Sequence, residues 1–161
     1  MKEHFLKESK EIINTEEGII IKNRYPIRVR YVDTDRMGFV YNGNYLAFFE
    51  VGRTELMRSF GLVYSKLEES GYQLPLVESY VRYFNAATYD DILEIEAILK
   101  LNSINAKLRF DYNVFRAYDL IASGHTTHLF MKVDTKKAVR VPEVFMSDIN
   151  KLKQKFLNNE I

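Results

Sequence analysis

The alternation of apolar and polar positions predicts several antiparallel strands. Apolar side chains at 25, 27, 29 and 31 alternate with Pro and Arg, which predicts a half-buried strand over 25–31. The same period of two predicts strands over 93–101 and 106–114. The less polar stretch over 120–133 is interpreted as a strand buried on both faces, and a further strand is expected over 74–84. Because the links at 102–105 and 116–119 are short, the last three strands along the chain should be antiparallel neighbours.

A period of three to four residues predicts a helix over 43–60. Its apolar face comprises Tyr45, Phe48, Phe49, Gly52, Leu56 and Phe60. Asn42 is expected to be the N-cap and Gly61 to end the helix. A short helix over 62–70 and an amphipathic C-terminal helix over 145–156 complete the pattern. One apolar helix packed on a curved antiparallel sheet defines an α+β domain.

Residues 1–22 show no such clear period and are predicted to be an N-terminal arm. The arm is interpreted either as a short helix or as a frayed segment with a strand at 19–21. Residues 23–161 then form a single domain that includes the C-terminal helix.

Composition narrows the class of protein. The chain has 161 residues, and 23 Lys and Arg oppose 22 Asp and Glu, which gives a net charge of +1. A nucleic-acid-binding protein would normally carry a surplus of basic residues, so this charge does not indicate nucleic-acid binding. Cysteine is absent, which excludes disulfides and thiolate nucleophiles. With no apolar leader or membrane span apparent, we expect a cytoplasmic protein without membrane association.

The segment from Asp33 to Gly38 places two carboxylates two residues apart, ahead of a glycine. A calcium loop of the EF-hand type would need an oxygen ligand at its fifth position and a Glu at its twelfth. Those positions hold Met37 and Asn44, so the calcium interpretation is disfavoured. Two interpretations remain: the carboxylates cap a turn, or one of them is catalytic.

The catalytic interpretation depends on the helix start that follows. A helix N-terminus presents unpaired backbone N–H groups, which suit a developing oxyanion. Gly43 would let a ligand approach that backbone closely. Asp35 and the N–H groups at Asn42 and Gly43 could together act on one carbonyl, although spacing alone favours turn capping for the aspartates.

A metal site is not expected. His125 and His128 are three residues apart in a predicted strand, so they should point to opposite faces of the sheet. The chain also lacks a Gly-x-Ser-x-Gly motif and a glycine-rich phosphate loop, so the sequence does not support a serine hydrolase or a nucleotide-binding protein.

The segment YVDTDRMGFVYNGNY (31–45) resembles the signature of the 4-hydroxybenzoyl-CoA thioesterase family, in particular its YbgC-like acyl-CoA thioesterases. Further agreement comes from RTELM (53–57), ATYDDILEI (87–95) and SGHTT (123–127). The resemblance extends over residues 26–142. It implies a hot-dog fold, in which a curved antiparallel sheet wraps a long central helix, assembled as homodimers or homotetramers with active sites at the dimer interface.

The resemblance also implies roles for individual residues. Asp35 would be the nucleophile or general base, and the backbone N–H of Asn42, helped by Gly43, would form the oxyanion hole. YbgC-like relatives often carry His at the position of Asn42, so only the backbone role is carried over. Asp33 is expected to support the turn, and Glu50 to be paired at an interface or to assist catalysis.

The resulting hypothesis is an acyl-CoA thioesterase that needs neither metal nor cofactor. Val40, Tyr41 and Tyr45 are expected to contact the substrate. An acyl-carrier-protein thioesterase and a non-catalytic acyl-thioester binding protein are the alternatives.

Overall fold

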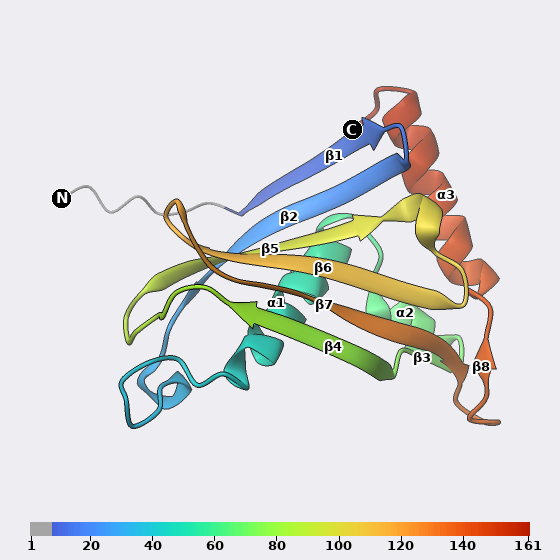
Figure 1. Ribbon diagram of the computed structural model, residues 1–161. Helices are drawn as coiled ribbons and strands as arrows, with labels where there is room; N and C mark the ends of the chain where they lie inside the picture. The colour runs from blue at the N-terminus through green and yellow to red at the C-terminus, as the bar shows by residue number, and fades with distance from the viewer. Residues whose placement is uncertain (1–7) are drawn as a thin grey trace.

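The computed structural model describes residues 8–161 of the chain (Figure 1). The strands are β1 (Ser9–Thr15), β2 (Gly18–Arg28), β3 (Tyr72–Gln73), β4 (Leu76–Tyr83), β5 (Ile92–Lys100), β6 (Lys107–Arg116), β7 (Asp119–Lys132) and β8 (Ala138–Val139). The helices are α1 (Asn44–Ser59), α2 (Tyr64–Glu69) and α3 (Glu143–Leu157), with 3-10 turns at Tyr31–Asp33 and Leu101–Ser103. Across residues 8–161, every helix is too short or too polar to cross a lipid bilayer.

The strands form one antiparallel sheet in the order β1-β2-β5-β6-β7. Strands β3, β4 and β8 each pair with β7. The predicted antiparallel pairing of the last three long strands is confirmed, with Ile95 opposite Val114 and Tyr112 opposite Gly124. Short links enforce this order, because they leave no room for a crossover.

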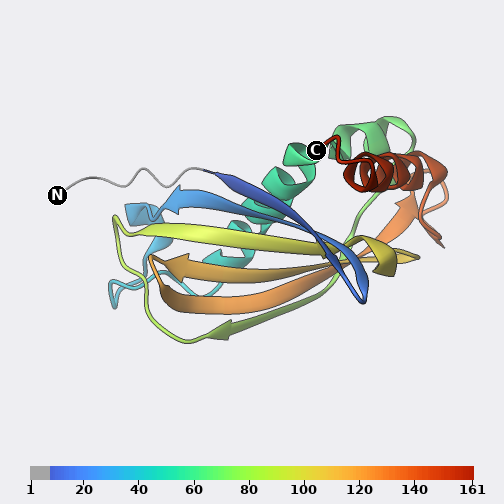
Figure 2. The same ribbon diagram turned by 90° about the horizontal axis from the view of Figure 1, so that it is seen from above.

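The three helices lie on the same side of the sheet, and α1 lies against its curved surface (Figure 2). Phe49 and Leu56 of α1 are fully buried against the sheet. Gly52 allows close approach, since a Cβ there would lie 2.6 Å from Cγ2 of Ile95 on β5. The predicted combination of one helix and a curved antiparallel sheet is therefore confirmed.

The start of α1 differs from the prediction. The helix begins at Asn44, the N-cap is Gly43, and no side chain caps the first turn. Asn42 instead lies in the preceding turn with its side chain exposed. At the other end Gly61 ends the helix as expected, with a φ of 73° that favours glycine.

The predicted arm over residues 1–22 also needs correction. Residues 9–15 form β1 and pair with β2, and the proposed boundary at residue 22 falls inside β2. Ile21 is fully buried, because β2 in turn pairs with β5 in the centre of the sheet. The described part of this segment is therefore sheet, which includes the strand anticipated at 19–21. Residues 1–7, with His4, lie outside the described residues.

Candidate active site

The loop between β2 and α1 holds the two aspartates singled out in the sequence. In Figure 1 it projects at the lower left, beside the arrowhead of β4. Strand β2 ends at Arg28, and a 3-10 turn over Tyr31–Asp33 breaks the period of two. As a result Asp33 is buried whereas Asp35 is half-buried, so the two side chains do not share one strand face.

Asp33 anchors this loop. Its carboxylate accepts hydrogen bonds from the Arg30 side chain at 2.8 and 3.1 Å and from the Arg30 backbone N–H at 2.8 Å. The Arg30 side-chain bond holds the pKa of Asp33 below its usual value, against the opposing effect of burial. The Asp33 carbonyl also accepts from Tyr41 N–H and from the Asn44 side chain, the first residue of α1. These contacts support a structural role for Asp33.

Asp35 lies on the first arm of a small hairpin. Thr34 bridges to Val40, and the Asp35 N–H donates to the Phe39 carbonyl at 2.8 Å. Carboxylate atom Oδ1 accepts a bond of 2.9 Å from the Met37 N–H, and Oδ2 has no hydrogen-bond partner among residues 8–161. The hairpin thus orients one carboxylate oxygen by a turn and leaves the other available to a reactant.

Two backbone donors follow directly on the second arm. The neighbouring N–H groups of Val40, Tyr41 and Asn44 all have backbone acceptors. In contrast, the N–H groups of Asn42 and Gly43 have no acceptor among residues 8–161, and both residues are exposed. Two adjacent free N–H groups at a helix N-terminus form a site suited to a developing negative charge.

Gly43 has a local steric reason to be glycine. A Cβ at this position would lie 2.8 Å from Cε1 of the Tyr41 ring. The missing side chain lets that ring fold beside the turn while the backbone stays accessible.

The loop over residues 84–91, between β4 and β5, fixes the position of the turn that precedes α1. The Val40 N–H donates to the Ala87 carbonyl at 2.8 Å. Asp91 holds this loop, because its carboxylate accepts from the Thr88 N–H at 2.9 Å and from Arg116 at 2.8 Å. These bonds lower the pKa of Asp91 although burial acts in the opposite direction. The candidate site is therefore tied to β6 through a chain of hydrogen bonds that ends at the half-buried contact between Asp91 and Arg116.

The three residues expected to contact substrate lie in different environments. Val40 is 6% exposed and belongs to the core, and Tyr45 is 3% exposed and packs edge-on against Tyr83. Burial raises the pKa of Tyr45 to about 12. Only Tyr41, 54% exposed, presents its ring at the surface of this chain.

A cavity of about 490 Å³ lies beside the C-terminal half of α1, a feature that sequence patterns did not reveal. Its lining includes Glu50, Arg53, Met57, Tyr64, Phe110 and His128. Glu50 is exposed and its carboxylate lies 3.7 Å from Arg53, so its partner is on its own helix.

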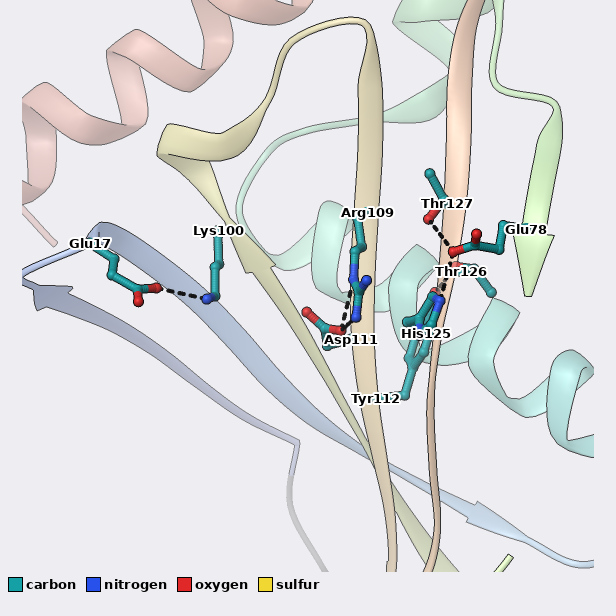
Figure 3. Close-up of polar contacts among 9 residues, drawn as sticks. All are labelled: Glu17, Glu78, Lys100, Arg109, Asp111, Tyr112, His125, Thr126 and Thr127. Carbon is teal, nitrogen blue, oxygen red and sulfur yellow. Dashed lines mark hydrogen bonds and ion pairs between the residues drawn. The ribbon is translucent and has the colours of Figure 1, made fainter. Parts of the chain in front are cut away.

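A chain of buried polar side chains begins at His128 in the wall of this cavity. His128 is 3% exposed, and its Nδ1 bonds the Leu74 carbonyl at 3.2 Å. A carbonyl only accepts, so Nδ1 carries the proton and Nε2 accepts from the Thr126 hydroxyl at 3.1 Å. Thr126 accepts in turn from the Tyr112 hydroxyl at 2.7 Å (Figure 3). Burial lowers the pKa of His128 and raises that of Tyr112 to about 12, which keeps the chain neutral.

The second strand histidine lies on the other face of β7, as the period of two predicts. His125 Nε2 lies 2.8 Å from the Glu78 carboxylate on β4, and Thr127 Oγ1 approaches the same carboxylate (Figure 3). The two histidines consequently do not converge on one ion. Among the described residues, no group of three or more His, Asp or Glu side chains is placed to hold a metal.

Comparison with known proteins identifies the family. The sequence profile of the thioesterase-like superfamily matches residues 29–149, which include the whole candidate site. The chain belongs to this superfamily. Membership confirms the predicted family and hot-dog fold, and it makes the chain a thioester hydrolase.

Individual thioesterase-like relatives agree with this assignment. A protein of Aquifex aeolicus, provisionally named an esterase, is 33% identical over 120 residues, 74% of this chain and 91% of that protein. The acyl-CoA thioesterase YbgC of Haemophilus influenzae is 40% identical over 73 residues, 45% of this chain and 54% of that protein. Among solved structures, a DHNA-CoA thioesterase of Staphylococcus aureus has a TM-score of 0.75 at 27% identity, covering 86% of this chain and 94% of that chain.

Proposed function

We propose that this chain hydrolyses an acyl-CoA thioester to a carboxylic acid and CoA at the loop between β2 and α1. The observation that carries the proposal is the pair of free N–H groups at Asn42 and Gly43, next to a hairpin that presents Asp35. The acyl-CoA substrate comes from the similarity to acyl-CoA thioesterases and from a related solved structure in complex with CoA.

The two N–H groups supply electrostatic stabilisation. When the thioester carbonyl is attacked, its oxygen gains negative charge, and donors fixed in advance stabilise that charge more than they stabilise the substrate. The positive end of the α1 dipole adds to this effect at the same place. Because both donors belong to the backbone, the Asn42 side chain has no required role.

Asp35 supplies the attacking group in one of two ways. As nucleophile, its carboxylate adds to the carbonyl carbon, CoA thiolate leaves, and water hydrolyses the resulting anhydride. As general base, it takes a proton from the water that attacks the carbonyl directly, and the C–S bond breaks to release CoA when the tetrahedral intermediate collapses. The free Oδ2 atom of Asp35 is the atom that would act in either case.

We infer that a homodimer completes the site. Strand β4 pairs only with β7 among the described residues, and Leu76, Tyr80 and Tyr83 on it are each about half exposed. An unpaired edge of this kind favours pairing with a second copy. A twofold axis near the middle of β4 would place the 490 Å³ cavity of one copy beside the Asn42 turn of the other. That cavity could then receive the acyl group.

Thiol release tests the proposal. A chromogenic thiol reagent would follow hydrolysis of short, long and aromatic acyl-CoAs by the wild-type protein and by Asp35→Asn. We expect the wild-type protein to hydrolyse one of these acyl classes and Asp35→Asn to lose that activity. Light scattering should also give about 38 kDa or a multiple, twice the 19.0 kDa chain mass, and a monomer would contradict the shared site.

Two other outcomes identify the alternatives. Hydrolysis of acyl-carrier-protein thioesters without hydrolysis of acyl-CoA would move the substrate class to carrier proteins. Acyl-CoA binding in calorimetry without turnover of either substrate would leave a binding protein and refute the catalytic role of Asp35.

A further inference from the structure

Tyr83, the last residue of β4, contacts the turn that precedes α1. Its hydroxyl donates a hydrogen bond of 2.9 Å to the backbone carbonyl oxygen of Asn42. The ring lies edge-on against Tyr45 of α1, with the ring centroids 5.2 Å apart. This contact joins the free edge of the sheet to the candidate oxyanion hole, two regions 41 residues apart in sequence.

The position of this bond matters because of peptide geometry. The carbonyl of Asn42 and the N–H of Gly43 belong to one planar trans peptide and point in opposite directions. Tyr83 and, at 3.4 Å, the Tyr45 N–H hold the oxygen on one side. The free Gly43 N–H is therefore directed to the other side. A bond accepted by the carbonyl also polarises the amide and strengthens its N–H as a donor.

We propose that Tyr83 is a positioning residue that orients and polarises the 42–43 peptide for oxyanion stabilisation, an inference that rests on the function proposed above. Tyr83 itself does not contact the reacting atoms; it acts through the Asn42 carbonyl. Burial, with a contribution from Tyr41, raises the pKa of Tyr83, so the hydroxyl retains the proton that it donates.

Removal of one hydroxyl tests the proposal. Tyr83→Phe keeps the ring contact with Tyr45 and deletes only the bond to Asn42. The kcat should fall about three- to tenfold, the worth of one hydrogen bond, while KM changes less than about twofold. This split is expected because the Gly43 donor strengthens in the transition state. Thermal unfolding of the variant would show that the fold is retained.

Tyr118→Phe is the control away from the site and from the β4 edge. Tyr118 lies in the turn between β6 and β7, it is fully exposed, and its hydroxyl makes no hydrogen bond within residues 8–161. The control should keep the wild-type kcat.

An infrared measurement separates positioning from general stability. The probe is a ketone analogue of the best acyl-CoA, with CH₂ in place of sulfur and a ¹³C-labelled carbonyl. Polarisation by the oxyanion hole lowers its stretching frequency, and Tyr83→Phe should show a smaller lowering than wild type or Tyr118→Phe. Unchanged kcat and frequency in Tyr83→Phe would overturn the role of Tyr83 alone. No turnover by the folded wild type would overturn the proposed function and this inference with it.

Discussion

Gly124 on β7 is the position where one added methyl group should disturb the fold most. A Cβ there would lie 2.1 Å from the backbone oxygen of Tyr80 on β4 and 2.8 Å from the Phe49 ring on α1. Because an ordinary C···O contact is about 3.3 Å, the β4 backbone would have to move by roughly 1 Å. The added methyl group would lie between the β4 backbone and the Phe49 ring, which stacks on Tyr112, so it could not be accommodated by moving one flexible side chain.

The size of the effect follows from opposing contributions. Overpacking of this kind costs about 1–3 kcal/mol, and the weakened β4–β7 pairing adds to that. Replacement of glycine within a strand recovers about 0.5–1 kcal/mol. We therefore expect Gly124→Ala to lower the free energy of unfolding by about 2 kcal/mol and the Tm by about 4–8 °C.

Urea denaturation followed by circular dichroism would measure this change, with Gly52→Ala as the comparison. At Gly52 the close contact is with a side-chain atom of Ile95, and alanine improves helix propensity by about 1 kcal/mol. Gly52→Ala should therefore lose less stability than Gly124→Ala. If Gly124→Ala were as stable as wild type, or lost less than Gly52→Ala, the steric reasoning would be refuted.

Two further predictions concern His128 and Asn42. Because burial lowers the pKa of His128, the unfolded chain binds this proton at a higher pH than the folded chain does, so stability should fall as the pH drops below about 6.5. Urea titrations at several pH values should show a shallower fall for His128→Gln, and equal slopes would contradict the buried neutral ring. Asn42→Ala retains both free N–H groups and should keep kcat within about twofold of wild type. A hundredfold loss would instead show that the Asn42 side chain takes part.

Local sequence patterns predicted the strands and helices well, because the alternating faces of strands and the spaced apolar positions of α1 reflect burial directly. The sequence pattern did not predict β1, because the contacts that hold this strand come from another segment of the chain. Its residues Ser9–Thr15 are mostly exposed, so pairing with β2 rather than burial holds it in the sheet. A strand of this kind leaves little periodic signal in its own sequence.

The candidate site likewise has features that the local sequence predicted and features that depend on contacts between distant segments. The motif around Asp35 placed it in the loop that carries the free N–H groups, since that information lies within a dozen residues. The different environments of Asp33 and Asp35 depend on a 3-10 turn that interrupts the strand period. The contact between Tyr83 and the Asn42 carbonyl, and the cavity wall at His128, depend on the register of β4 with β7, which a single sequence does not specify.

The central claim is that Asp35 acts on a thioester carbonyl held by the Asn42 and Gly43 N–H groups. The most direct measurement compares kcat for the best acyl-CoA among wild type, Asp35→Asn and Asp134→Asn. Asp134 is an exposed turn residue whose Oδ1 accepts a backbone N–H, as Oδ1 of Asp35 does, so it controls for the replacement of a turn carboxylate by a neutral amide. We expect Asp35→Asn to lose at least about a hundredfold in kcat and Asp134→Asn to match wild type. Full turnover by a folded Asp35→Asn protein would contradict the account.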